Sequence, residues 1–141
     1  MSDLKGRCLC GGVTVTAKGK FTEADACHCK MCRRQNGGGA FYAGHFEGGV
    51  NFEGPGLVWY SSSDYAERGF CEICGSTISW RMNAMPDQAS VSLGLFDEAP
   101  GQISSRIFTD EAGEYEQLPQ DVPHKTGAQV IAEFMAKQEN N

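Results

Sequence analysis

The seven cysteines of this chain fall into three clusters, and their spacing limits the possible folds more than any other feature of the sequence. They lie in the segments Cys8-Leu9-Cys10, Cys27-His28-Cys29-Lys30-Met31-Cys32 and Cys71-Glu72-Ile73-Cys74. Zinc takes four thiolates in a closed structural site, whereas a catalytic site keeps three protein ligands and one open position. Seven thiols divide into one set of each kind. The spacing therefore predicts two zinc sites.

Other uses of clustered cysteines fit this chain less well. A disulfide framework is typical of short secreted chains with an even cysteine count, whereas this count is odd and the first residues lack the apolar run of a signal peptide. Cys8 and Cys10 are also too close in sequence for ordinary disulfide geometry. An iron–sulfur cluster takes four cysteines too, but the spacings are not those of ferredoxins. Buried cysteines without any metal are the remaining alternative, and zinc is preferred to all three.

The length and composition favour one globular domain in the cytoplasm. The chain has 141 residues, 40% of them hydrophobic and 21% charged, which suits a single domain over residues 1–141. No apolar run approaches the roughly 18 residues that span a bilayer, so we expect no membrane segment. A net charge of −6 argues against a nucleic-acid partner. Seven thiols without an export signal indicate a reducing, cytoplasmic setting.

The residue pattern predicts a mainly β fold with antiparallel strands. Eighteen glycines indicate many turns, and β-branched or aromatic residues alternate in short runs between them. We expect the strand at 40–46 to pair with the one at 57–60. The predicted strands span residues 11–17, 40–46, 57–60, 66–70, 76–82, 89–96 and 103–109.

Two helices are expected. No residue from 30 to 36 breaks a helix, and Gly37 is placed to end it. The second spans about 126–137, with Thr126 and Gln129 forming a capping box. Its apolar stripe is expected to pack on the sheet and consists of Val130, Ile131, Phe134 and Met135.

The two outer cysteine pairs are assigned to the closed structural zinc site. Each pair presents two sulfurs from one turn, and two such turns side by side complete a tetrahedron. This site would join the N-terminal strand to the middle of the chain. Its ligands would be Cys8, Cys10, Cys71 and Cys74.

The remaining thiols, Cys27, Cys29 and Cys32, are assigned to the catalytic zinc site. Cys29 and Cys32 would share one helix face near its start. His28 is a possible fourth ligand, but on extended backbone its side chain points away from its neighbours, so a hydrogen-bonding or surface role is preferred. His45 and His124 carry no spacing signal. Because its metal would be exchangeable, this second site is expected to be partly empty in some preparations.

Three thiolates make zinc a weak Lewis acid that suits a soft incoming sulfur. The predicted chemistry is therefore the holding of a small substrate thiol as its thiolate for reaction with a carbon electrophile. Arg33 and Arg34 follow the last ligand and are the candidate substrate-binding residues, for a carboxylate of the thiol. Their alternative role is helix-end solvation and neutralisation of the thiolates. Arg68 and Arg81, near the other thiol pair in sequence, are interpreted as structural.

Three segments, in this order and spacing, resemble one known family. They are Gly-Arg-Cys-Leu-Cys-Gly-Gly-Val, Cys-His-Cys-Lys-Met-Cys-Arg-Arg and Glu-Arg-Gly-Phe-Cys-Glu-Ile-Cys-Gly-Ser. The chain is similar to the glutathione-dependent formaldehyde-activating enzymes over about residues 5–125; a centromere-associated vertebrate protein is among their relatives. The resemblance implies a small, zinc-stabilised, β-tent-like fold with two metal sites. It also implies reversible addition of formaldehyde to glutathione, giving S-hydroxymethylglutathione.

The leading hypothesis is a zinc-dependent carbon–sulfur lyase acting on a small thiol, such as glutathione, and an aldehyde. Two alternatives remain open at this point. One is a non-enzymatic zinc module that binds a protein partner, with both metals structural. The other is a redox or metal-buffering role for the open site.

Overall fold

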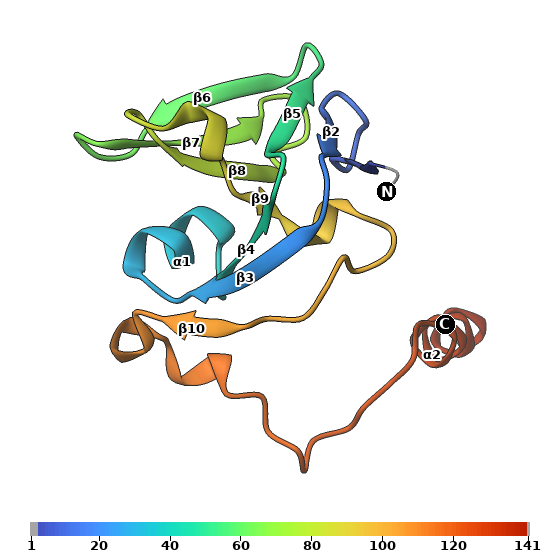
Figure 1. Cartoon of the computed structure of the whole chain (residues 1–141). Helices are drawn as coiled ribbons and strands as arrows, with labels where there is room; N and C mark the ends of the chain where they lie inside the picture. Colours follow the sequence, from blue (N-terminus) through green and yellow to red (C-terminus); the bar gives the residue numbers. More distant parts are fainter. Residues whose placement is uncertain (1–2, 141) are drawn as a thin grey trace.

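Three small β-sheets form the body of the structure, a computed structural model that describes residues 3–140 (Figure 1). The first sheet has the order β1-β2-β5, with bounds Leu4–Arg7, Thr14–Ala17 and Val50–Glu53. The second has the order β10-β3-β4-β9, with bounds Ser105–Ile107, Phe21–Cys27, Phe41–Phe46 and Val91–Ser92. The third has the order β6-β7-β8, with bounds Leu57–Ser61, Ala66–Cys71 and Thr77–Met82. Neighbouring strands are antiparallel except β10 and β3. The mainly β prediction is confirmed.

Helices are few and short. The α-helices are α1, Lys30–Asn36, and α2, Gly127–Glu139; the 3-10 helices are η1, Pro86–Gln88, η2, Leu93–Leu95, η3, Thr109–Glu111, and η4, Glu114–Glu116. Gly37 ends α1 in the left-handed conformation, with φ of 73°, as predicted. Among residues 3–140, no helix has the length and apolar character needed to cross a membrane.

One predicted strand pairing is wrong. β4 pairs with β3 and β9, while β6 pairs with β7, so the segments 40–46 and 57–60 lie in different sheets. The reason lies in the segment between them. It forms a strand of its own, β5, which pairs with β2 and carries the chain from the second sheet to the first before β6 begins.

The predicted strand over 89–96 is also much shorter than expected. Within this segment only β9 forms a strand. It pairs with β4 through Ser92 opposite Ala43 and Val91 opposite Gly44. The chain then turns into η2, so that Leu95 and Phe96 pack into the main core instead of continuing along β4.

The hydrophobic core forms two clusters of buried side chains. The main cluster draws on all three sheets and contains two thiols; its members are Cys8, Val13, Val15, Ala17, Cys71, Ile78, Val91 and Phe96. The smaller cluster contains Cys32, Phe41 and Ala43, with Cys27, Cys29 and Trp80 packed against it. Both clusters therefore include cysteines, and neither uses a residue beyond Phe96.

The C-terminal helix forms as predicted but does not pack on a sheet. Thr126 and Gln129 make the reciprocal capping-box hydrogen bonds, which stabilise the helix locally. Every residue from 117 to 140 is exposed, including the apolar stripe. Figure 1 shows α2 apart from the sheets at the end of an extended segment. The expected packing is wrong because the exposed segment before α2 leads the helix away from the sheets.

Deletion of residues 126–141 should therefore leave the stability of the sheets unchanged, with a melting temperature within about 2 °C of the full chain. The matched control is Ile78→Ala, since Ile78 is fully buried. That substitution should lower the free energy of unfolding by about 2–5 kcal/mol. Thermal and urea unfolding would measure both variants. A truncation as damaging as Ile78→Ala would show that the helix packs on the domain in solution.

Candidate functional site

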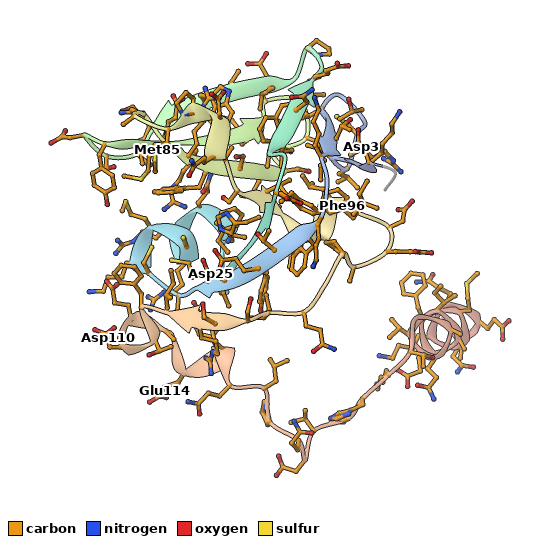
Figure 2. All side chains as sticks on the ribbon, viewed as in Figure 1. Asp3, Asp25, Met85, Phe96, Asp110 and Glu114 are labelled. Atoms are coloured by element: carbon orange, nitrogen blue, oxygen red, sulfur yellow. The ribbon has the colours of Figure 1, made fainter. Side chains whose placement is uncertain are left out.

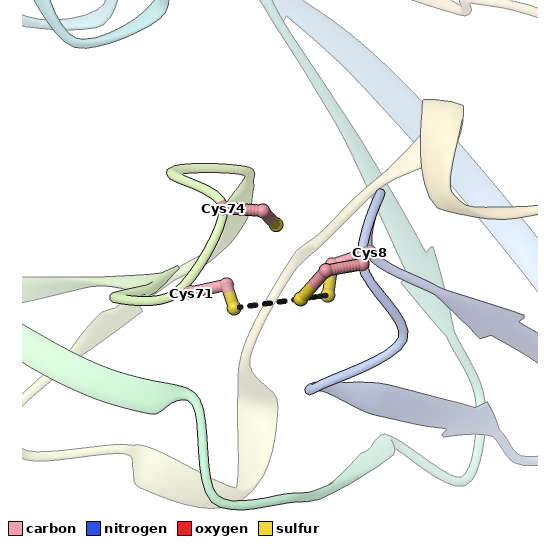
Figure 3. Close-up of side chains that lie close together, drawn as sticks. Cys8, Cys71 and Cys74 are labelled. Carbon is pink, nitrogen blue, oxygen red and sulfur yellow. Dashed lines mark hydrogen bonds between the residues drawn. The ribbon is translucent and has the colours of Figure 1, made fainter.

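Four thiols from two distant turns converge at the first candidate site. The sulfurs of Cys8, Cys10, Cys71 and Cys74 all lie within 4.8 Å of one another, and Figure 3 shows three of these side chains meeting. The Cys8–Cys10 and Cys10–Cys71 sulfur distances are both 3.8 Å. A tetrahedral zinc with metal–sulfur bonds of about 2.3 Å has sulfur–sulfur edges of about 3.8 Å. All seven cysteines are free, so this donor set fits a four-coordinate metal.

The local backbone supports the sulfurs of the first turn. The Gly12 amide donates to the Cys10 sulfur at 3.3 Å, and the Val13 amide donates to the Cys8 sulfur at 3.2 Å. Such bonds favour thiolate over thiol. The Gly56 backbone lies against the Cys71 sulfur so closely that a Cβ there would be 2.6 Å from it. Only glycine, which has no Cβ, allows the backbone to lie this close to the sulfur.

Ser76 connects the two thiol turns and was not predicted from the sequence. Its hydroxyl oxygen accepts the Leu9 amide at 3.2 Å and lies 3.2 Å from the Cys74 sulfur. The hydrogen bond to Ser76 lowers the pKa of Cys74 to about 5. The signal in the sequence that could have indicated this role is a hydroxyl residue two positions after Cys74.

The second candidate site forms where β3 meets α1. Cys27 ends β3, Cys29 is the N-cap of α1 and Cys32 lies in its first turn. Their sulfurs lie within 4.8 Å of one another. Burial raises the pKa of Cys32 to about 12. Burial also acts to raise the pKa of Cys29, but the Cys32 amide bonds to its sulfur at 3.3 Å and the net effect is a lowered pKa.

Arg68 is a buried cation at this second site. Its Nη1 donates to the Cys32 sulfur at 3.3 Å and to the side-chain oxygen Oε1 of Gln35 at 3.0 Å, and the residue is only 4% exposed. The sequence interpretation placed Arg68 with the other thiol pair. Arg68 and Cys71 are three residues apart on β7, and an odd separation puts them on opposite faces of the strand. A buried guanidinium beside thiols supplies the positive charge that compensates for the negative charge of buried thiolates.

The three thiols open into a cavity of about 560 Å³. One wall is the face of the second sheet, and the opposite wall includes Arg68 and Trp80 from the third sheet. The third wall comes from the segment that follows β10. The remaining lining residues are Asp25, Lys30, Met31, Phe41, Ala43, His45, Tyr65, Ser90, Ile107, Phe108 and Glu111. This is a small-molecule cavity with mostly apolar walls and a few charged groups.

His28 fastens the segment after β10 to the thiol loop. The side chain is buried, its Nδ1 lies 2.8 Å from the Glu116 carboxylate, and Arg106 Nε donates to its Nε2 at 3.1 Å. Because a guanidinium can only donate, Nε2 accepts from Arg106 and Nδ1 faces the carboxylate. The hydrogen bond from His28 lowers the pKa of Glu116. No motif marks Arg106 or Glu116, so sequence reasoning missed both.

The candidate substrate residues Arg33 and Arg34 do not line the thiol cavity. Arg33 Nη1 donates to the Glu111 carbonyl oxygen at 2.6 Å. Arg34 lines a second hollow, which shares Met31 and Arg68 with the thiol cavity. The two hollows therefore adjoin.

These features define a small β protein with one closed and one open thiol cluster, each suited to bind a metal. Residues 3–111 match the family described as glutathione-dependent formaldehyde-activating enzyme. The chain belongs to this family, as the resemblance indicated.

Two individual proteins are similar to parts of the chain. An uncharacterized lyase of Schizosaccharomyces pombe is 30% identical over 78 residues, which are 55% of this chain and 57% of that protein. The chain thus matches just over half the length of that relative. A crystal structure of a Rhodobacter sphaeroides protein matches with a TM-score of 0.58 at 21% identity, over 73% of this chain and 99% of that one. At this identity the match supports the fold alone.

The two thiol clusters should respond differently to loss of one sulfur. Cys71→Ser should lower soluble yield and melting temperature markedly, because Cys71 is buried in the main core and metal binding is linked to folding. Cys29→Ser should leave a folded protein that has lost only the metal of the three-thiol cluster. Thermal unfolding and metal analysis by mass spectrometry would measure both. Equal destabilisation by the two substitutions would contradict the division.

Arg68→Met should weaken metal binding at the three-thiol cluster, because the substitution removes the buried cation beside Cys32. Breaking a buried charge pair costs roughly 3 kcal/mol, or about a hundredfold in affinity. Competition with a chelator of known affinity would measure the loss. The control is Arg81→Met, since Arg81 pairs with Glu67 at 2.7 Å and lies over Trp59. Equal metal affinity in both variants would show that Arg68 does not support the cluster.

Proposed function

We propose that this protein is a zinc-dependent carbon–sulfur lyase that catalyses the reversible formation of S-hydroxymethylglutathione from glutathione and formaldehyde. Membership of the formaldehyde-activating family and a relative named as a lyase support an enzyme of this kind. The observation that carries the proposal is the three-thiol cluster, which opens directly into a cavity of about 560 Å³.

In this proposal the thiols have two roles. Cys8, Cys10, Cys71 and Cys74 hold a structural zinc, and Cys27, Cys29 and Cys32 hold the catalytic one. Bound there, zinc would supply a Lewis acid that favours the ionised form of a substrate thiol at neutral pH. Three thiolates and one dication leave a charge of −1, which the Arg68 guanidinium offsets.

The cavity walls suit a small electrophile and a longer thiol. Phe41, Trp80 and Ile107 give apolar surface beside the sulfurs, which limits water and so favours the aldehyde over its hydrate. Only the sulfur end of glutathione would need to lie in this cavity, and the rest of the molecule would extend beyond it. The rest of the glutathione molecule would extend past Met31 and Arg68 into the adjoining hollow, where Arg34 could bind one of its carboxylates. Arg33 is proposed as a second residue that binds a carboxylate of the substrate.

One observation favours a different function. The apolar stripe of α2 is exposed to solvent, as expected for a segment that binds a protein partner. A zinc module for protein interaction is therefore the second candidate function.

Zinc-loaded protein should accelerate exchange between formaldehyde and S-hydroxymethylglutathione above the uncatalysed rate, as followed by NMR with carbon-13 formaldehyde. Cys29→Ser should abolish the acceleration. Glutathione should also change the visible absorption of the cobalt-substituted protein, which reports thiol binding without turnover. Arg34→Ala should weaken that binding by about 1.5–3 kcal/mol without loss of metal. If no small thiol gave a rate above background, the interaction module would be the better account.

A further inference from the structure

Two ionisable side chains outside both thiol clusters lie on the cavity wall formed by the second sheet. The register pairs Cys27 with Phe41 and Asp25 with Ala43, and His45 lies two residues further along β4. Side chains alternate between the faces of a strand, so these five residues share one face, and all five line the cavity. Figure 2 marks Asp25 on β3 close to α1.

Asp25 and His45 lie close together within this wall. Asp25 Oδ2 lies 3.7 Å from His45 Nε2, and the two side chains are 28% and 33% exposed. The Ser105 hydroxyl donates to Asp25 Oδ1 and fixes the carboxylate from β10. Catalytic contacts are often long in a free enzyme and tighten when substrate binds. An imidazole beside a carboxylate on a cavity wall is the arrangement expected of a general acid–base residue that its neighbour orients.

The three histidines of the chain differ in what their ring nitrogens bind. His28 has both nitrogens occupied and is buried. His124 is exposed in the segment before α2. Within residues 3–140, the imidazole of His45 contacts only Asp25 among charged partners, through Nε2. No hydrogen bond to its Nδ1 is present within residues 3–140, and His45 lines the cavity. Imidazole is the side chain best suited to proton transfer near neutral pH.

The strand register separates His45 from the thiols along the cavity wall. Asp25 and Cys27 are two residues apart on β3, which corresponds to about 7 Å. His45 lies opposite Glu23, two residues beyond Asp25, so a substrate at the thiols must extend along the strands to meet it. Because His45 and the three thiols line the same cavity, a substrate bound at the thiols occupies the space that His45 also borders.

We propose that His45 is the proton-transfer residue of this cavity, and that Asp25 and Ser105 are positioning residues that orient it. The inference rests on the proposed function. His45 accepts the proton of the substrate thiol; the sulfur then forms a bond to the aldehyde carbon as the carbonyl π bond opens to an alkoxide. His45 returns the proton to that oxygen, giving the hydroxymethyl adduct. The reverse reaction follows the same steps backwards, with no oxidant or reductant.

The test compares His45→Ala with His124→Ala in the NMR exchange assay, using zinc-loaded full-length protein. His45→Ala should lower the maximal rate by about 100-fold, a typical general acid–base contribution, and added imidazole should restore part of it. His45→Gln, which keeps a side chain of similar size, should show the same loss. His124→Ala should match the wild type. Metal content and glutathione binding, read from the cobalt spectrum, should be unchanged in all three variants.

Asp25 is tested by its two conservative changes. Asp25→Asn should lower the maximal rate while the apparent affinity for glutathione stays constant, and Asp25→Glu should recover part of the rate. A wild-type rate in His45→Ala, or a loss of rate matched by a loss of metal, would overturn this inference and leave the proposed function intact. A wild type that does not catalyse exchange with any small thiol would overturn both.

Discussion

The rest of the structure depends on the meeting of four sulfurs from two turns about sixty residues apart in sequence. Cys8 and Cys71 lie in the main core as well as in this cluster, so the same contact joins the sheets and forms a metal-binding set. It holds the end of β7, in the third sheet, against the turn between β1 and β2, in the first sheet. Arg68 and Trp80 lie on β7 and β8, and both face the cavity. The closed cluster therefore anchors the sheet that supplies one wall of the cavity beside the open cluster.

The open cluster combines short-range and long-range structure. Its three thiols come from six consecutive residues, which pass from the end of β3 into the first turn of α1. The cavity beside them needs partners from far along the chain. Arg68 comes from the third sheet, while His28, Arg106 and Glu116 fasten the segment that carries Ile107 and Phe108 to the thiol loop. A small domain thus encloses a cavity even though its core is modest.

Local sequence signals predicted the parts that depend on local physics. The cysteine spacing indicated the grouping of the thiols, Gly37 ended α1, and Thr126 capped α2. Predictions that needed distant partners were less reliable. The pairing of β4 with β6 was wrong because β5 takes the chain to another sheet. The packing of α2 was wrong because an apolar stripe shows that a face can be buried, not that the domain has room for it.

By itself, the sequence determined the mainly β class, the two thiol sets and the short helix at the second set. These follow from residue type and spacing over a few positions, where backbone geometry leaves few alternatives. Only the tertiary structure decided which charged residues meet the thiols. Arg68 faces the three-thiol cluster because of strand alternation and sheet packing, and Asp25 meets His45 because of the β3–β4 register. Such contacts join residues 20 to 40 positions apart, and no local spacing records them.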